Sequence, residues 1–386
     1  MSSLGASQAA AGASSADPIR VMVVDDALVI RGMLSRMLEE AGDISVVASA
    51  GDGERALAQL RRNPVEVVVL DIEMPNMDGI EALPKIVSEH PNTQVVMAST
   101  LTKRNAEISL KAMELGAADY VTKPGSTGEL RSADEFKREL VEKVRSLGKA
   151  ARRRAGRLAP KSTTFRADPS RPTAAMPLQV KGREIVLRPL KPFRPDALAI
   201  GSSTGGPQAL MRVLKDLGEV RQPIFITQHM PPTFTTILAE HIGRSTGRKC
   251  VEGATGMAVE SGGIYLAPGE RHMLIRSSGG RTVIELTEDP PENFCRPAVD
   301  PMLRSLSTVY GAKLLVTILT GMGSDGVKGG KVCIDAGAQV LAQDEATSVV
   351  WGMPGAAAAA GICGAVLPLE KIGQEIRRFA VDGGRP

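Results

Sequence analysis

The chain has few aromatic residues, few histidines and few cysteines, and each scarcity excludes a class of protein. Of 386 residues only 3% are aromatic, so little surface is available to stack on nucleic-acid bases. The four cysteines lie far apart, with no CxxC pair and no histidine at ligand spacing. Neither a structural zinc site nor a disulfide framework is therefore expected. A reduced, cytoplasmic protein is the simplest interpretation.

Long apolar runs are absent too. No stretch reaches the ~18 apolar residues that a membrane-spanning helix needs, so we expect no membrane insertion. Residues 1–17 are rich in Ala, Ser and Gly, and they lack the basic start and apolar centre of a secretory signal. We expect them to form a flexible tail.

The net charge of +4 is unevenly distributed. Residues 149–195 hold 13 Lys and Arg against two acids, together with seven prolines, so the rest of the chain is acidic. Such a segment cannot bury enough apolar surface to fold alone. We expect a basic, Pro-rich linker over residues 149–194, in which 183–188 could form a short strand. The basic charge of this segment leaves open a non-enzymatic function for the chain, in which it would act as a DNA-binding or scaffold output protein. We nevertheless expect no nucleic-acid partner.

Before the linker, Val-rich apolar runs alternate with amphipathic segments. The runs predict strands at 19–24, 44–49, 65–70, 93–99 and 119–122, and helices near 27–41, 53–61, 79–89, 104–115 and 129–147. This alternation predicts a five-stranded parallel sheet covered by helices on both faces. We place this α/β domain at residues 18–138, with a closing helix that ends near 148.

The alternation resumes after the linker. Strands are expected at 197–203, 223–228, 312–320 and 339–343, and helices near 206–217, 233–244 and 326–337. Residues 250–290 hold short alternating runs and Gly-rich turns, which are typical of hairpins. The pattern predicts a second, doubly wound α/β domain over residues 195–380 with an antiparallel insertion.

Polar side chains stand at the ends of the first domain's strands. Asp25 and Asp26 follow the first strand, Asp71 the third, Ser99 the fourth and Lys123 the fifth. In a parallel sheet these ends meet at one edge. Carboxylates gathered there repel one another unless a hard cation such as Mg²⁺ neutralises them, and a hydroxyl and an ammonium suit phosphoryl oxygens. Singly, each Asp could instead be a helix N-cap.

The motifs "VVDD", "VLDIEMPNMDG" and "YVTKP" resemble the receiver domain of bacterial response regulators, which is flavodoxin-like. The resemblance implies that Asp71 accepts a phosphoryl group from a histidine kinase and that Asp25 and Asp26 help it hold Mg²⁺. Lys123 and Ser99 would sense the phosphoryl oxygens, with Thr100 as a one-residue alternative to Ser99. Phosphorylation would then act as a switch on the second domain.

The second domain contains a candidate nucleophile in "AIGSSTGGPQAL". Gly201 to Gly205 fit the pattern G-x-S-x-G, with Ser203 at the centre of a sharp strand-to-helix turn. A phosphate-binding loop fits less well, because the Lys of a Walker loop and the second glycine of a dinucleotide fingerprint are both missing. Ser202 and Thr204 are expected to bond nearby backbone.

A serine nucleophile needs a base, and the base needs an orienting carboxylate. His229 directly follows a predicted strand, at the same sheet edge as Ser203, whereas His272 begins a strand and is its rival. Asp325 follows another strand through the Gly-rich "GMG", and the Met322 amide is a candidate oxyanion donor. Asp325 could alternatively be a simple N-cap.

The motifs "GSSTGGP", "ITQHMPP", "YLAPGERHM", "CRPAVD" and "LTGMGSDG" resemble the catalytic domain of the chemotaxis protein-glutamate methylesterases, the CheB family. The resemblance implies a Ser203–His229–Asp325 triad that demethylates glutamate methyl esters on chemoreceptors, releases methanol, and deamidates receptor glutamines. It implies no cofactor for the ester hydrolysis itself. Ser202 departs from the family pattern, in which Ala is common.

Overall fold

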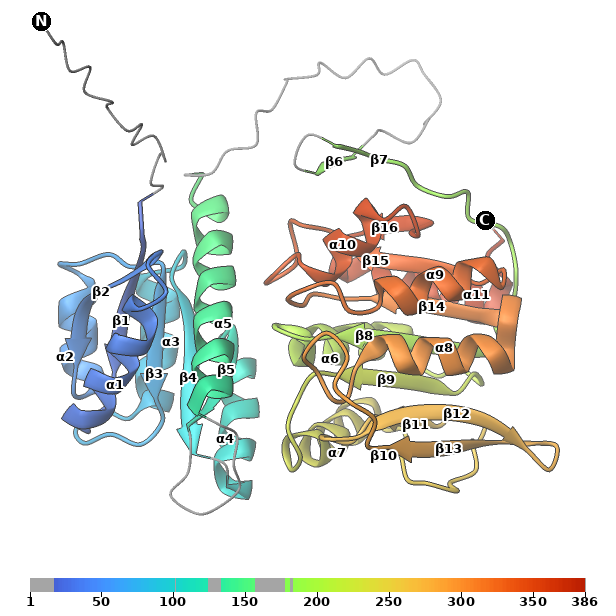
Figure 1. Cartoon of the computed structure of the whole chain (residues 1–386), viewed down its shortest axis with the longest axis horizontal. Coiled ribbons are helices and arrows are strands. Elements are labelled where there is room, and N and C mark those ends of the chain that lie inside the picture. Colours follow the sequence, from blue (N-terminus) through green and yellow to red (C-terminus); the bar gives the residue numbers. More distant parts are fainter. Residues whose placement is uncertain (1–16, 101, 124–132, 157–177, 181–182, 386) are drawn as a thin grey trace, which may run out of the picture.

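The computed structural model of the chain describes residues 17–100, 102–123, 133–156, 178–180 and 183–385. The expected tail, the start of the helix expected near 129–147 and most of the expected linker lie outside these ranges. Two α/β units stand side by side, the first built from residues up to 156 and the second from residue 183 onward (Figure 1). No helix within the described ranges is long and apolar enough to cross a membrane.

The first unit is a five-stranded, wholly parallel sheet, as the sequence predicts. Its strand order is β2-β1-β3-β4-β5, the flavodoxin-like order. The strands are β1 (Ile19–Val24), β2 (Ile44–Ala50), β3 (Val67–Asp71), β4 (Gln94–Thr100) and β5 (Asp119–Lys123). The helices are α1 (Leu28–Glu39), α2 (Gly53–Leu60), α3 (Gly79–Glu89), α4 (Lys103–Glu114) and α5 (Ala133–Arg154).

Helix α5 is longer than the sequence predicts. The expected end near residue 147 is wrong, since the helix continues to Arg154, into the segment assigned to the linker. Ala150 and Ala151 are buried, and Arg152 pairs with Glu66 and donates to the carbonyls of Asp17 and Pro18. Composition alone cannot separate a solvated tether from a helix whose arginines are paired by the fold.

The second unit contains a seven-stranded parallel sheet in the order β10-β11-β9-β8-β14-β15-β16. Its strands are β8 (Ala197–Ser202), β9 (Ile224–Gln228), β10 (Cys250–Glu252), β11 (Ile264–Leu266), β14 (Leu314–Ile318), β15 (Gln339–Gln343) and β16 (Ala365–Leu367). Its helices are α6 (Gly206–Leu217), α7 (Phe234–Thr246), α8 (Val299–Tyr310), α9 (Val327–Asp335), α10 (Met353–Ala359) and α11 (Leu369–Asp382).

The region 250–290 is only partly a hairpin. β12 (His272–Ser278) and β13 (Arg281–Thr287) form the expected antiparallel insertion. β10 and β11, in contrast, pair in parallel and extend the main sheet through β9. Their three-residue length hides the direction of pairing from the sequence. A further short pair joins β6 (Leu178–Val180) to β7 (Arg183–Ile185), so the strand expected near 183–188 is confirmed.

The order of the second sheet positions its candidate site. The chain proceeds outward from β8 to β9 on one side and from β14 to β15 on the other, so the topology reverses between β8 and β14. Ligands of doubly wound sheets bind beside such a reversal, at the carboxyl ends of the strands. Ser203 follows β8, and the "TGMGSDG" loop follows β14.

The two units meet through α4 and β5 of the first and α6 and α7 of the second (Figure 1). The ring of Tyr120 stacks on that of Phe234, with centroids 4.3 Å apart. Gln208 Nε2 donates hydrogen bonds to the carbonyls of Met113 and Ala117. The interface therefore combines an aromatic stack with hydrogen bonds to the end of α4.

Candidate functional site

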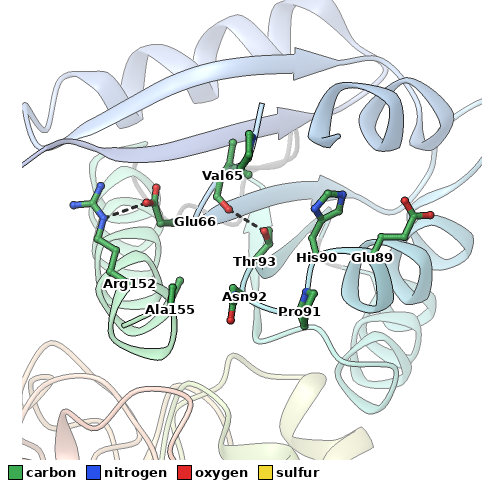
Figure 2. A pocket seen from close by; sticks show the side chains of 11 residues that line it. Val65, Glu66, Glu89, His90, Pro91, Asn92, Thr93, Arg152 and Ala155 are labelled. Atoms are coloured by element: carbon green, nitrogen blue, oxygen red, sulfur yellow. Dashed lines mark hydrogen bonds and ion pairs between the residues drawn. The ribbon is translucent and has the colours of Figure 1, made fainter. Parts of the chain in front are cut away.

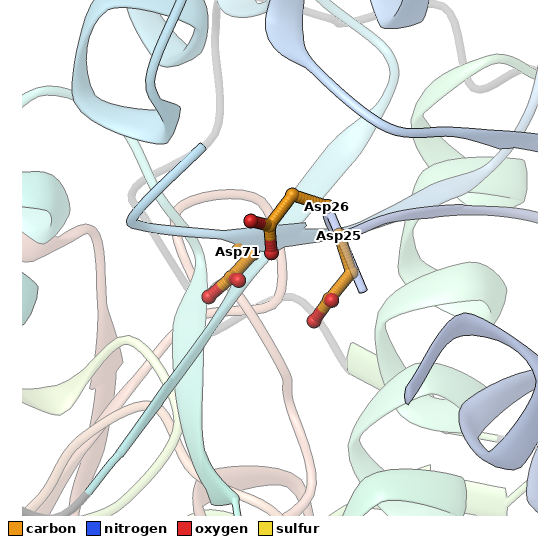
Figure 3. Close-up of side chains that lie close together, drawn as sticks. All are labelled: Asp25, Asp26 and Asp71. Carbon is orange, nitrogen blue, oxygen red and sulfur yellow. The ribbon is translucent and has the colours of Figure 1, made fainter. Parts of the chain in front are cut away.

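The three carboxylates expected at one edge of the first sheet do converge (Figure 3). Oxygen atoms of Asp25, Asp26 and Asp71 all lie within 4.8 Å of one another. Lys123 Nζ lies 2.6 Å from Asp25 Oδ2 and 2.7 Å from Asp71 Oδ1. Asp25 and Asp71 are buried, whereas Asp26 is exposed. Four of the five predicted residues are thus brought together.

Asp71 is held in an environment that disfavours its charge. Burial raises the pKa of Asp71 to about 6, in spite of the opposing Lys123 ammonium, and the Asp25 carboxylate adds to the rise. A divalent cation would reverse this balance, because clustered carboxylate oxygens are the ligands that Mg²⁺ prefers. The donor set therefore fits Mg²⁺.

Ser99 is not joined to this cluster by a hydrogen bond within the described residues. Its buried Oγ lies 3.2 Å from Ser109 Oγ of α4. Thr100 Oγ1, the alternative hydroxyl, accepts from Asn105 Nδ2, also in α4. Both hydroxyls are therefore engaged with α4, the helix that contacts the second unit.

The Ser203 turn is fixed by close backbone contacts. Gly205 has φ +75°, a left-handed conformation that glycine adopts without strain, and it caps α6. Ser203 N–H donates to the Thr320 carbonyl. A Cβ on Gly321 would lie only 2.9 Å from Ser203 Cβ, so a glycine is required for the loop after β14 to reach Ser203. Ser203 is partly exposed.

His229 and Asp325 form the hydrogen bond that the sequence predicts. His229 Nε2 lies 2.8 Å from Asp325 Oδ2, and the two side chains are 11% and 1% exposed. Asp325 does not cap its own helix, α9, whose N-cap is Gly326. It instead accepts the amides of Val299 and Asp300 at the start of α8. Burial would raise the pKa of Asp325, but the hydrogen bonds from His229 and these amides hold it below its usual value.

Two residues that the sequence did not single out as site residues hold Asp325 in place. Asn293 Nδ2 donates to Asp325 Oδ1 at 2.9 Å and to Asp300 Oδ2 at 3.1 Å. Asp300 Oδ1 also accepts the Gly329 amide at 2.6 Å. Burial raises the pKa of Asp300, and the neighbouring Asp325 adds to the rise. Asn293 thus donates to both of two neighbouring buried carboxyl groups.

The second nitrogen of His229 faces a cysteine. Cys295 Sγ lies 3.3 Å from His229 Nδ1, and within the described residues no hydrogen bond joins Ser203 Oγ to His229. Burial alone would lower the pKa of His229, but the Cys295 sulfur and the Asp325 carboxylate outweigh it and raise this pKa to about 10. Cys295 stands 66 residues from His229 in the chain, and although it begins the "CRPAVD" motif, nothing in that motif indicated a contact with the base.

Gln228, the last residue of β9, connects the serine and histidine turns. Its Nε2 donates to the carbonyls of Ser203 and His229, and its Oε1 accepts from Ser202 Oγ at 2.7 Å. A polar residue directly before a candidate base could have marked Gln228 in the sequence. Ser202, the departure from the family pattern, has this bond as its structural role.

His272, the rival base, is excluded by its partners. It is buried, its Nδ1 accepts the Ala298 amide, and its Nε2 donates to the Pro290 carbonyl. Both nitrogens are thus committed to backbone. The Met322 amide, in contrast, makes no hydrogen bond to any other described residue and stays available as a donor.

A separate hollow of about 250 Å³ lies at the opposite edge of the first sheet (Figure 2). Glu66, His90 and Arg152 help to line it, and Arg152 Nε lies 3.2 Å from Glu66 Oε1. Thr93 Oγ1 donates to the Val65 carbonyl on its wall. No residue of the acidic cluster or of the Ser203 site lines this hollow.

Comparison with known proteins places both units in described families. Residues 21–134 match the response regulator receiver domain, and residues 198–376 match the CheB methylesterase domain. The protein-glutamate methylesterase/protein-glutamine glutaminase of Azospirillum brasilense is 55% identical, over 96% of this chain and 94% of the relative. Its counterpart in Paramagnetospirillum magneticum is 54% identical, over 94% and 97%. The solved catalytic domain of Thermotoga maritima CheB methylesterase is 36% identical, with a TM-score of 0.47, over 48% of this chain and 98% of that one.

Proposed function

Because this chain belongs to the CheB methylesterase family of response regulators, we propose that Ser203, His229 and Asp325 are its catalytic triad. The chain is a protein-glutamate methylesterase and protein-glutamine glutaminase of chemotaxis signalling. The supporting observation is the buried His229–Asp325 pair, which lies beside the Ser203 turn at the reversal of the sheet. A DNA-binding or scaffold output is not favoured, since residues 198–376 match a hydrolase domain.

The hydrogen bonds assign a role to each nitrogen of His229. Nε2 donates to Asp325, so Nδ1, which faces Cys295, is the nitrogen left to act as the base. Nδ1 takes the proton of Ser203 Oγ as this oxygen attacks the methyl ester carbonyl of a receptor glutamate. The Met322 amide donates to the oxyanion that forms.

The second half of the reaction returns the proton. His229 Nδ1–H protonates the departing methoxide, which leaves as methanol, and an acyl-enzyme remains on Ser203. A water molecule then gives a proton to Nδ1 and attacks the acyl carbon. Nδ1–H returns this proton to Ser203 Oγ as the bond to the acyl carbon breaks, which releases the glutamate and restores Ser203. With a receptor glutamine the leaving group is ammonia.

The first unit supplies the control. We propose that this protein is cytoplasmic and that Asp71 accepts a phosphoryl group from a histidine kinase of the same chemosensory pathway. Asp25, Asp26 and Asp71 would hold Mg²⁺, which neutralises the crowded oxygens during transfer. Lys123 already pairs with Asp25 and Asp71 and would move to the phosphoryl oxygens. Ser99 would do the same after release from Ser109.

We assign residues 1–17 to a tail, 18–138 with helix α5 to the receiver, and 195–380 to the catalytic domain. The linker then begins after Arg154, since residues 149–154 belong to α5. The unphosphorylated receiver restrains the catalytic domain through the α4–β5 interface, and phosphorylation loosens it. The position of Tyr120 supports this restraint. Tyr120 contacts Phe234 of the catalytic domain, and it lies on β5, three residues before Lys123.

The test is methanol release from a methylated chemoreceptor fragment by the full chain, with and without a small phosphoryl donor. Ser203→Ala should lower the rate by about 10³–10⁶-fold, as removal of a triad nucleophile does elsewhere. Ser202→Ala is the matched control, because it removes a neighbouring hydroxyl but leaves Ser203. Full activity in Ser203→Ala would show that another residue is the nucleophile.

A further inference from the structure

The nitrogen that must accept the Ser203 proton is held by another side chain. His229 Nε2 is bound to Asp325, and the remaining nitrogen, Nδ1, lies 3.3 Å from Cys295 Sγ. A thiol can donate its proton to an imidazole nitrogen, and a thiolate can accept one from it. Ser203 and Cys295 therefore compete for the same nitrogen.

The loop that carries Cys295 is anchored to the triad acid. Its preceding residues Asn293 and Phe294 have φ of +51° and +64°, and paired backbone bonds join Glu292 to Cys295. Within this turn, Asn293 donates to Asp325. Asp325 thus positions His229 on one side and, through Asn293, the cysteine loop on the other. The contact between sulfur and imidazole follows from this anchored turn.

Cys295 differs from the other cysteines in its surroundings. Cys333 and Cys363 are buried among apolar residues, and burial raises their pKa to about 12. Burial also raises the pKa of Cys250 to about 12. Cys295 is only partly buried and touches an imidazole. Of the four cysteines, Cys295 is thus the one whose sulfur contacts an imidazole nitrogen.

The contact between Cys295 and His229 offers a proton transfer that would block the base. Cys295 and Asp325 contact its two nitrogens, and Asp300 lies behind Asp325. Farther out, the Arg304 guanidinium on α8 is paired with Glu292 of the cysteine loop. Transfer of the thiol proton from Sγ to Nδ1 leaves an anion at each end of the imidazolium. In that state Nδ1 has no lone pair for the Ser203 proton.

We propose that Cys295 is a positioning residue that restrains the catalytic base, because its sulfur keeps His229 Nδ1 occupied until the thiolate takes the proton back. The restraint rests on the proposed role of His229. It makes the hydrolysis of the ester depend on the contact with a thiol that takes no part in the bond-making steps.

The first test compares the pH–rate profiles of wild type, Cys295→Ser and Cys295→Ala, measured as methanol release by the phosphorylated full chain. Both substitutions remove the ionisable thiol, but serine keeps a polar group beside Nδ1. Loss of a contacting anion should lower the pH of the acid limb by about one unit or more in both variants. A shift in the alanine variant alone would indicate a packing role and overturn the proposal. So would an unshifted profile in both, or a loss of activity in both.

The second test needs no ester substrate, so it separates this proposal from the proposed triad. Alkylation of each cysteine by iodoacetamide is followed against pH by peptide mass analysis, with Cys333 and Cys363 as internal references. The pH at which Cys295 reacts should depend on His229, whose imidazole contacts the sulfur. His229→Gln should move its reaction to higher pH by about one unit or more. An ordinary profile for Cys295 that His229→Gln leaves unchanged would overturn the restraint, whatever the esterase results.

Discussion

Thr204 Oγ1 donates a 2.6 Å hydrogen bond to Asp119 Oδ2 across the interface between the two domains. Both side chains are buried. Thr204 directly follows the proposed nucleophile, and Asp119 begins the strand that ends at Lys123. Asp119 also pairs with Lys143 of α5 at 3.2 Å. The turn that carries Ser203 is therefore tied to the strand that carries the phosphoryl-sensing lysine.

Thr204→Val should raise the methanol-release rate of the unphosphorylated chain. A hydrogen bond to a charged acceptor contributes about 1.5–3 kcal/mol, so its loss should weaken the restraint by about tenfold or more. The rate with phosphoryl donor should change less, because phosphorylation already loosens the interface. The measurement is the methanol-release rate with phosphoryl donor divided by the rate without it, and this ratio should fall in Thr204→Val.

Gln208→Met is the matched variant for this prediction. It removes the bonds to the Met113 and Ala117 carbonyls but leaves the Ser203 turn untouched. A fall in the rate ratio for both variants would locate the effect in the interface. A fall for Thr204→Val alone, or for neither, would contradict an inhibitory contact there.

Asp71→Asn should abolish activation by a small phosphoryl donor. Coupling between sites is typically worth about 5- to 150-fold, so the donor should raise the wild-type methanol-release rate by a factor in this range and leave the variant at its basal rate. Removal of Mg²⁺ with EDTA should have the same effect on the wild type. Ser203→Ala serves as the control, since it should still incorporate phosphate while releasing no methanol. Equal donor-dependent rates in wild type and Asp71→Asn would refute the switch.

Asn293→Gly should lower the thermal stability of the chain, because it removes the donor between two buried carboxyl groups. An unsatisfied buried group costs about 1–3 kcal/mol. Glycine adopts the left-handed backbone of this position without strain, so the loss reports the missing amide. Asn293→Asp should destabilise more at neutral pH, and the excess should shrink as acid protonates the added carboxylate. Equal melting temperatures for wild type and Asn293→Gly would contradict this role.

The contribution of His229 to stability should fall with rising pH. Its pKa is raised from 6.5 to about 10 in the folded protein, so the protonated form stabilises the fold. This contribution is fully present below pH 6.5 and is lost as the pH rises through about 10. The melting-temperature difference between wild type and His229→Gln should therefore shrink over this range. His241→Gln, which replaces a partly buried histidine of α7 outside the site, provides the control, and a difference that grows with pH would reverse the sign of the argument.

The sequence predicted the two sheets better than it predicted the ends of the helices and the pairing of the short edge strands. Val-rich strands and amphipathic helices have distinct periods, so both parallel sheets and the β12–β13 hairpin could be inferred. The end of α5 could not, because the Arg152 side chain is held by Glu66 and by the carbonyls before β1. The parallel pairing of β10 and β11 involves only three residues on each strand, too few to show an alternation.

The sequence predicted the site where its residues end strands. Asp25, Asp71 and Lys123 converge because parallel strands end at one edge, and His229 reaches Asp325 for the same reason. Asn293 and Cys295 come from an irregular loop after the hairpin, where no periodicity says which way a side chain points. Their contacts with Asp325 and His229 depend on a turn that only the three-dimensional structure reveals.

The position of Asp325 at the start of α8 links the architecture of the domain to its chemistry. Its carboxylate accepts the first amides of that helix as well as the His229 imidazole, so one negative charge completes a helix terminus and orients a base. A shortened or lengthened side chain at 325 would shift the anchor of a twelve-residue helix together with the imidazole. The same carboxylate thus serves the α8 terminus and the proposed catalytic base, so a substitution at 325 should disturb the fold and the chemistry together.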